Sequence, residues 1–188
     1  MDKEYPTGEE GKAKLREIAE KIKKEGKNKL YDCVIGLSGG ADSSYLLHYA
    51  VKELGLRPLG VNIDNGWDTE IAKSNLKKVT EKLGVDVRVY KAEEPEYTDI
   101  TRALLLRSVP EMDAHADIAL ATLWNQACRD AGVKYFLIGH SFRTEGMFPI
   151  GWFYFDGKYV RELYGKPFKT FPNLTFWKFI KNTLYGVK

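Results

Sequence analysis

A short run of small and hydroxylated residues, Ser38–Ser44, is the part of the sequence best suited to chemistry. Gly39 and Gly40 lack a Cβ atom, so an anion can approach their backbone N–H groups closely. Hydroxyl donors come from Ser38, Ser43 and Ser44. Asp42 adds a carboxylate, which beside phosphates indicates a Mg²⁺ ion between them. The run therefore predicts a site for a phosphate-containing ligand.

The residues around this run predict a strand, a tight loop and a helix. Residues 33–37 are continuously apolar, which is typical of a strand buried on both faces. From Tyr45 to Leu54 apolar residues recur with helical spacing, and Gly55 ends the pattern. The N-terminus of such a helix carries a partial positive charge, which favours an anion in the loop.

Three other interpretations of the loop are weaker. The common P-loop requires a lysine after its glycines, and none follows Gly40 here. Residues 36–40 also fit the nucleophile elbow of α/β-hydrolases, but that fold needs an earlier strand-to-helix loop for its oxyanion hole. The residues before Cys33 predict only one charged helix, so no such loop is expected. A plain strand-to-helix turn remains an alternative, but it explains only the two glycines and not the serines and the aspartate around them.

Strands and helices are predicted to alternate along the chain, which indicates an α/β fold with a doubly wound parallel sheet. Further strands are predicted at 58–63, 85–90 and 135–138, and helices at 9–24, 69–83, 97–107, 118–131 and 174–184. Ligands of such sheets bind beyond the carboxyl ends of the strands. We therefore expect Ser38–Ser44, Asp64–Trp67 and Gly139–Gly146 at one edge of the sheet.

Composition limits the classes of function. The chain has 188 residues, of which 44% are hydrophobic and 29% charged, as in ordinary globular proteins. No apolar run approaches the ~20 residues of a membrane span, so we expect a cytoplasmic protein without a membrane partner. The net charge of +3 is too small to predict nucleic-acid binding. Cys33 and Cys128 predict no disulfide framework and no Cys-x-x-Cys zinc site, and both are expected in the core.

The composition changes near residue 150. Residues 1–150 are predicted to form the ligand-binding domain, and residues 151–188 an aromatic and basic C-terminal extension. Mixtures of aromatic and basic residues bind single-stranded nucleic acid in some proteins. More often such a surface packs on another domain or subunit, which is the interpretation favoured here.

The loop resembles the pyrophosphate loop of the N-type ATP pyrophosphatases, the PP-loop superfamily, whose pattern Ser-Gly-Gly-x-Asp-Ser-Ser stands at residues 38–44. The superfamily has an adenine nucleotide alpha hydrolase-like (HUP-type) fold and includes GMP, NAD, asparagine and argininosuccinate synthetases and tRNA thiolases. Its members cleave ATP between the α and β phosphates and adenylate a substrate oxygen. A nitrogen or sulfur nucleophile then displaces AMP. The resemblance implies that this chain uses ATP and Mg²⁺.

A second set of motifs resembles the N-acetyl sugar amidotransferases of surface-polysaccharide and nonulosonic-acid pathways. These motifs are Asp64-Asn65-Gly66-Trp67, Asp113-x-His115-Ala116, Ala121-Thr122-Leu123, Thr144-Glu145-Gly146 and Lys169-Thr170-Phe171-Pro172. Such enzymes convert an acetamido group of a sugar into an acetamidino group. The resemblance implies that ATP adenylates the acetamido oxygen of an N-acetylated sugar and that ammonia, supplied by a separate glutaminase subunit, displaces AMP.

The resemblance also assigns roles to residues. The nucleotide is expected on Gly36, Ser38, Gly39, Gly40, Asp42, Ser43, Ser44, Asp64, Asn65, Gly139 and His140. Within that set, Ser38, Asp42 and His140 are the expected catalytic residues, with His140 stabilising charge as AMP leaves. Asp42 and Glu145 are the expected Mg²⁺ ligands. Contacts with the sugar are expected from Trp67, His115, Arg143 and Thr144.

Each assignment has a simpler structural alternative. Ser43 and Ser44 are candidates for helix caps. Asp64 and Asn65 are equally typical of turns, and Trp67 of a residue that covers the sheet. Two other functions stay open, a thiolase-like tRNA-modifying enzyme and an ATP-binding module without catalysis. The absence of a cysteine pair to carry sulfur favours nitrogen transfer. The expected macromolecular partners are the glutaminase or a second copy of the chain, and not a nucleic acid.

Overall fold

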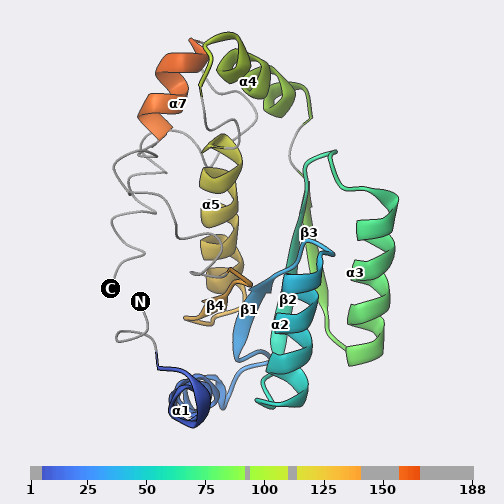
Figure 1. Cartoon of the computed structure of the whole chain (residues 1–188), viewed down its shortest axis with the longest axis vertical. Coiled ribbons are helices and arrows are strands. Elements are labelled where there is room, and N and C mark those ends of the chain that lie inside the picture. Colours follow the sequence, from blue (N-terminus) through green and yellow to red (C-terminus); the bar gives the residue numbers. More distant parts are fainter. Residues whose placement is uncertain (1–5, 92–93, 110–113, 141–156, 166–188) are drawn as a thin grey trace. The chain divides into compact units, whose positions relative to one another are not determined.

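The computed structural model describes residues 6–91, 94–109, 114–140 and 157–165 (Figure 1). In chain order the elements are α1 (Gly8–Gly26), β1 (Cys33–Gly36), α2 (Ala41–Lys52), β2 (Pro58–Asp64), α3 (Glu70–Leu83), β3 (Val87–Lys91), α4 (Glu94–Leu106), α5 (Ala114–Asp130), β4 (Phe136–Leu137) and α7 (Gly157–Tyr164). The predicted helix at 174–184 lies outside the described residues. Within these residues, no helix combines the length and the apolar composition needed to cross a bilayer.

The described residues belong to two compact units. The first comprises residues 1–62, 70–88 and 127–139, and the second comprises residues 63–69, 89–126 and 140–188, in both cases as far as the structure describes them. The first unit contains most of the sheet together with α1, α2 and α3, and the second contains α4, α7 and most of α5.

The sheet has four strands in the order β3-β2-β1-β4, so β1 is an inner strand. β1 pairs in parallel with β2, where Cys33 lies opposite Pro58, and in parallel with β4, where Ile35 lies opposite Leu137. An inner parallel strand is covered on both faces, which explains its continuous apolar sequence. Val34 and Ile35, whose side chains point to opposite faces, are both fully buried. The predicted parallel α/β sheet is confirmed.

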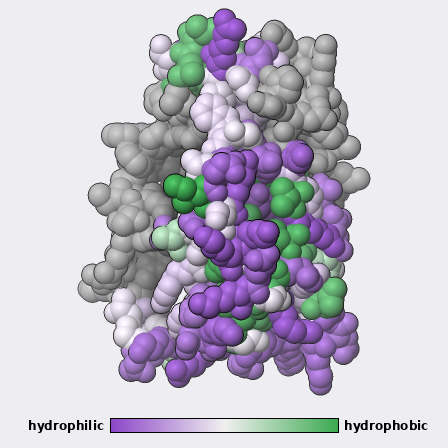
Figure 2. All heavy atoms as spheres, turned by 90° about the vertical axis from the view of Figure 1, so that its right-hand side faces the viewer, coloured by the Kyte–Doolittle hydropathy of each residue, from purple (hydrophilic) through white to green (hydrophobic). Residues whose placement is uncertain are grey.

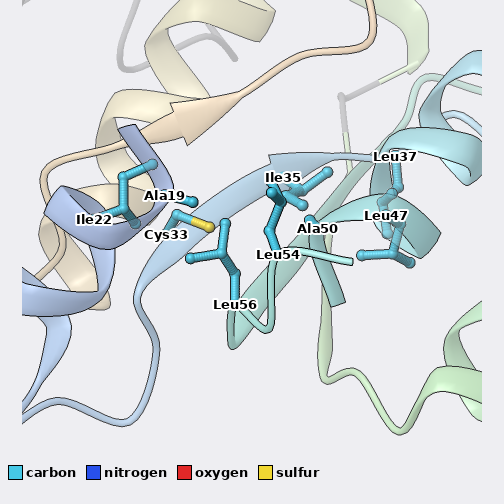
Figure 3. Close-up of a cluster of buried hydrophobic side chains, with 9 residues drawn as sticks. All are labelled: Ala19, Ile22, Cys33, Ile35, Leu37, Leu47, Ala50, Leu54 and Leu56. Atoms are coloured by element: carbon cyan, nitrogen blue, oxygen red, sulfur yellow. The ribbon is translucent and has the colours of Figure 1, made fainter. Parts of the chain in front are cut away.

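The core of the first unit lies against one face of β1 (Figure 3). Its buried side chains come from α1, β1, α2 and the segment after α2, and are Ala19, Ile22, Cys33, Ile35, Leu37, Leu47, Ala50, Leu54 and Leu56. On α3, Leu76, Val79 and Leu83 pack against this cluster, as their helical spacing predicts. The lysines of α3 are exposed, at positions 73, 77, 78 and 82, and the face that carries this helix is mainly hydrophilic (Figure 2).

An ion pair between the buried Asp32 and the half-exposed Arg57 ties the start of β1 to the start of β2. The Arg57 guanidinium binds both carboxylate oxygens of Asp32, with Nη2 at 2.6 Å from Oδ1 and Nε at 3.2 Å from Oδ2. Arg57 also donates to the carbonyls of Gly26 and Lys29, at 2.9 and 3.0 Å, which satisfies the end of α1. Gly26 must be glycine, because a Cβ atom there would overlap the Asp32 carboxylate.

The second unit has a core of its own between three helices. The buried residues are Ile100 and Leu104 of α4, Ala114 and Ile118 of α5, and Val160 of α7. The sequence analysis was wrong about two boundaries here and missed one helix. α4 begins at Glu94 rather than 97, because a proline in the first helical turn loses no hydrogen bond. α5 begins at Ala114 rather than 118. α7 was not among the predicted helices.

Candidate functional site

The loop after β1 leaves the strand at a point fixed by two hydrogen bonds. Leu37 N donates to the carbonyl of Val61 at 2.8 Å, which continues the ladder between β1 and β2. The carbonyl of Leu37 accepts a hydrogen bond of 2.9 Å from Asn62 Nδ2. Asn62 is buried, so this bond satisfies a side chain that would otherwise be costly inside the sheet. Sequence reasoning missed this residue, although an amide inside an apolar strand was a visible signal.

The loop is then held by hydrogen bonds among its own residues. Ser43 Oγ accepts from Ser38 N at 3.2 Å and donates to the carbonyl of Gly40 at 3.3 Å. Ser38 Oγ accepts from Gly40 N at 3.3 Å and lies 3.2 Å from Ser43 Oγ. Ser43 is buried, so its hydroxyl shapes the loop, and its role in binding pyrophosphate stays a prediction. The cap of α2 is Gly40, without a side-chain hydrogen bond, so the alternative that Ser43 or Ser44 caps the helix is wrong.

Gly39 is required where the loop meets α3. Its φ of +74° lies in the left-handed region that side chains disfavour. A Cβ atom there would overlap the carbonyl oxygen of Ala72 and lie 2.8 Å from the carbonyl carbon. Gly40 is different, because a Cβ atom there would meet only Ser38 Oγ, at 3.3 Å. Gly39 therefore permits the loop to pack against α3, whereas Gly40 leaves an exposed stretch of backbone open to a ligand.

The loop lies at the point where the strand order of the sheet reverses. From β1 the chain proceeds to β2 and β3 on one side, whereas β4 lies on the other side of β1. In open α/β sheets this point forms a crevice beyond the carboxyl ends of the strands, and ligands bind there. Gly139, which follows β4, approaches α2 so closely that a Cβ atom on it would lie 3.1 Å from the carbonyl oxygen of Asp42 and 3.2 Å from Ser43 N. The predicted nucleotide residues Ser38–Ser44 and Gly139 are thus neighbours.

The first turn of α2 presents groups suited to a phosphate and a cation. The first N–H groups of a helix have no partner within it, and they attract anions. Ser38, Gly40 and Asp42 are all exposed, so a ligand can reach the hydroxyl, the open backbone and the carboxylate. Within the described part of the chain, no three His, Cys, Asp or Glu side chains gather into a metal cage. The role of Asp42 as a Mg²⁺ ligand stays a prediction.

The turn after β2 is held by two successive side-chain to backbone hydrogen bonds. Asp64 Oδ1 accepts from Gly66 N at 3.2 Å, and Asn65 Oδ1 accepts from Trp67 N at 3.1 Å. Gly66 has a φ of +81°, and Trp67 is 65% exposed. Asp64 and Asn65 therefore both stabilise the turn through their side chains, which is the structural role considered above as an alternative to ligand binding. Their contact with a nucleotide, and that of Trp67 with a sugar, stay predictions.

The other predicted residues have very different settings. His115 is 1% exposed on α5, with Nε2 at 3.0 Å from Thr101 Oγ1. His140, which follows Gly139, is exposed. Arg143, Thr144 and Glu145 lie outside the described residues.

The two cysteines are buried and free, as predicted. Burial raises the pKa of the Cys33 thiol to about 12 and that of Cys128 to about 11. Both thiols are therefore protonated at neutral pH, and a protonated buried thiol is a poor nucleophile. Neither residue is suited to carry sulfur in a transfer reaction.

No protein-family model and no curated protein matches the sequence. Solved structures do. The glutamine-dependent NAD+ synthetase from Acinetobacter baumannii, determined with ADP, is similar over 90% of this chain and 30% of its own, at a TM-score of 0.53 and 16% identity. The NH3-dependent NAD synthetase from Campylobacter jejuni matches 69% of this chain and 57% of its own, at a TM-score of 0.48 and 15% identity. The NMN synthetase from Francisella tularensis matches 63% and 52%, at a TM-score of 0.45 and 16% identity.

The similarity to the Acinetobacter enzyme shows the fold. The chain has an α/β fold of the adenine nucleotide alpha hydrolase-like type, as predicted. NAD synthetases are among the members of the superfamily that the Ser38–Ser44 loop resembles. The chain spans between 30% and 57% of the length of these three synthetases, so their complete activities belong to longer chains.

Proposed function

We propose that the chain is an ATP-dependent amidotransferase that acts on an N-acetylated sugar and releases AMP and pyrophosphate. The observation that supports this most is the Ser38–Ser44 loop, which has a fixed shape, an open glycine and a helix N-terminus at the switch point of a parallel sheet. The motifs shared with the N-acetyl sugar amidotransferases supply the class of acceptor. The fold shared with the Acinetobacter synthetase agrees with an ATP-using enzyme but does not select the acceptor.

In this proposal the loop binds the β and γ phosphates as one leaving group. The N–H groups at the start of α2 and the Ser38 hydroxyl donate to phosphate oxygens, and Ser44 adds a second hydroxyl. Because Ser43 and Gly39 hold the loop in shape before the ligand arrives, little conformational entropy is lost on binding. The α-phosphorus then faces the acceptor. Asp64 and Asn65 bind the adenine and ribose.

Asp42 would hold the Mg²⁺ ion, with Glu145 as the second protein ligand. The ion neutralises negative charge on the phosphates when bound. Asp42 suits this role because its carboxylate is exposed in the first turn of α2, next to the predicted phosphate site. The carboxylate is thereby brought to the phosphates by the same helix whose N–H groups bind them.

The reaction has two steps. The acetamido oxygen attacks the α-phosphorus, the bond from this phosphorus to the bridging oxygen breaks, and pyrophosphate leaves. Ammonia then attacks the imidate carbon, and the C–O bond breaks so that AMP leaves with the electron pair. The nitrogen loses a proton to solvent and the product is an amidine. His140 would stabilise negative charge on the α-phosphate as AMP leaves.

Ammonia is the proposed nucleophile, delivered by a glutaminase partner. Nitrogen is favoured over sulfur because both thiols of the chain are buried and protonated. The aromatic and basic residues of 151–188 are the proposed docking region for that partner or for a second copy of the chain.

The deciding experiment measures the products formed from ATP with ammonium and a panel of N-acetylated sugars. AMP and pyrophosphate that appear only with a suitable sugar would support the proposal. ADP and phosphate would contradict the assignment to AMP-forming chemistry. Binding of ATP without any turnover would indicate a non-catalytic module, and incorporation of sulfur into tRNA would indicate the thiolase-like alternative.

A further inference from the structure

The function proposed above gives no role to Tyr97 and Thr101, which form a buried polar cluster with His115 in the second unit. Tyr97 of α4 and His115 of α5 are 5% and 1% exposed, and their ring centroids lie 4.4 Å apart. Thr101 Oγ1 lies 3.0 Å from His115 Nε2 and donates to the carbonyl of Tyr97 at 3.0 Å. Three residues of two helices thus hold one another in place. Polar groups are costly to bury unless they are hydrogen-bonded, and the bonds within this cluster offset that cost.

One hydrogen bond connects this cluster to the turn after β2. Asn65 Nδ2 donates to Tyr97 Oη at 3.3 Å, while Asn65 Oδ1 accepts from Trp67 N at 3.1 Å. Both ends of the Asn65 amide are therefore engaged, one by the turn itself and the other by α4. An amide held at both ends can neither flip nor change rotamer without losing a bond. Tyr97 Oη is the partner that comes from outside the turn.

We propose that Tyr97, supported by His115, is a positioning residue for nucleotide binding. This inference rests on the proposed function, in which Asp64 and Asn65 bind the adenine and ribose of ATP. Tyr97 does not touch the nucleotide. Its hydroxyl fixes the Asn65 amide and, through it, the backbone of the turn, so the ligand meets an ordered surface and does not have to order it on binding. His115 and Thr101 keep the tyrosine ring in the orientation that this bond needs.

The test removes a single hydroxyl group from each of two tyrosines whose hydrogen bonds lie within the second unit. Tyr97→Phe deletes the bond to Asn65 and keeps the ring that packs on His115. Tyr164→Phe is the matched control, because Tyr164 Oη of α7 donates to Asp99 Oδ2 of α4 at 3.0 Å, a bond that does not involve the turn. The full chain is used, and the dissociation constant for ATP, KM, kcat and amide hydrogen exchange at residues 65–67 are measured for each variant.

We expect Tyr97→Phe to raise the dissociation constant and KM for ATP about fivefold, which corresponds to ~1 kcal/mol, with kcat unchanged. Exchange of the Trp67 amide should accelerate in the same variant even without ATP. Tyr164→Phe should change neither quantity. Thr101→Val, which removes the hydroxyl that faces His115, should raise KM by a smaller factor, and Thr101→Ser should restore it.

The outcomes separate this inference from the proposed function. If the wild type binds ATP and Tyr97→Phe binds it equally well, the positioning role is wrong and the proposed function stands. If exchange accelerates but affinity does not change, the bond is structural only and the inference is again wrong. If the wild type does not bind ATP at all, both are wrong. A parallel loss of kcat and affinity in both tyrosine variants would indicate general destabilisation and would also contradict the inference.

Discussion

The loop after β1 and the turn after β2 follow neighbouring parallel strands but are stabilised in different ways. In the loop, the hydrogen bonds that set the shape join Ser38, Gly40 and Ser43, which lie within five residues of one another. In the turn, two short-range bonds are supplemented by one from Asn65 to Tyr97, which is 32 residues further along the chain. The loop carries most of its own conformation, whereas the turn depends partly on a separate helix.

This difference has a consequence for ligand binding. Because the loop is shaped locally and wedged against Ala72 by Gly39, its geometry should persist whether or not a ligand is present. The turn has Trp67 exposed and depends on a hydrogen bond of 3.3 Å to α4, so its geometry should be easier to change. We therefore expect the loop to be the more rigid of the two regions, and the order of the turn to depend on its hydrogen bond from another helix.

The largest effect is expected from Gly39→Ala in the loop. The new methyl group would overlap the Ala72 carbonyl and force a side chain into the left-handed region at a φ of +74°. The conformational cost is ~1–2 kcal/mol, and the overlap adds ~1–3 kcal/mol. Chemical denaturation should show this loss of unfolding free energy, and calorimetry should show loss of ATP binding.

Gly84→Ala is the matched control for that variant. Gly84 has a similar φ of +66°, but a Cβ atom there would meet nothing within 4 Å. It should lose only the ~1–2 kcal/mol of the conformational term and retain ATP binding. Equal losses in the two variants would show that Gly39 matters only for its φ, and the description of the loop as wedged against α3 would be wrong.

Asp42→Asn should abolish turnover while the fold stays intact. Asn keeps the shape of the exposed side chain but loses the charge that would hold Mg²⁺. Disturbance of even the outer partners of a metal costs roughly 10–100-fold, so loss of a direct ligand should reduce kcat by at least about 100-fold. Circular dichroism and the unfolding midpoint should match those of the wild type. Glu53→Gln, at the other end of the same helix, removes an equal charge and should leave turnover unchanged.

The local construction of the loop explains why the sequence predicted it well. β1, the loop and α2 follow from an apolar run, small residues and helical spacing, all within twenty residues or so, and the hydrogen bonds of the loop join near neighbours. The contact of Gly39 with Ala72 was not predictable, because it depends on how α3 packs. The sequence analysis explained Gly39 only by the close approach of an anion to its backbone. The structure adds that a side chain there would overlap the Ala72 carbonyl.

Long-range partners explain most of what was missed. Asp32 and Arg57 are 25 residues apart, and nothing in the local pattern of either residue indicates that they form an ion pair. The hydrophobic periodicity of neither segment indicates the bond from Asn65 to Tyr97, which are 32 residues apart. The helix α7 has only eight residues, so it depends on tertiary packing, which Val160 supplies in the core that it shares with α4 and α5.

A smaller effect is expected from Asn62→Ala at the base of the loop. The change removes the 2.9 Å bond to the Leu37 carbonyl and leaves that acceptor without its side-chain donor inside the sheet. The expected loss of unfolding free energy is ~1–3 kcal/mol. ATP affinity should fall as well, because Leu37 directs the chain into the loop.

Thr80→Ala is the control for the base of the loop. Thr80 is buried to the same extent as Asn62, at 6% exposure, but its hydroxyl bonds within α3, to the carbonyl of Leu76 at 2.8 Å. This variant should lose stability without weakening ATP binding. If it weakens binding as much as Asn62→Ala does, the effect of Asn62 reflects stability rather than the position of the loop.

The smallest effect is expected from Gly66→Ala, which tests whether the turn is less rigid than the loop. Gly66 is exposed with a φ of +81°, so the main expected cost is conformational, ~1–2 kcal/mol of local order. Because the turn is the more adjustable region, much of this cost should appear as faster amide exchange at residues 65–67 and little as a shift of the unfolding midpoint. Gly66→Asn should be milder, since asparagine tolerates left-handed backbone better than alanine. A loss of global stability as large as that of Gly39→Ala would show that the turn is as rigidly built as the loop, and the contrast between the two regions would no longer hold.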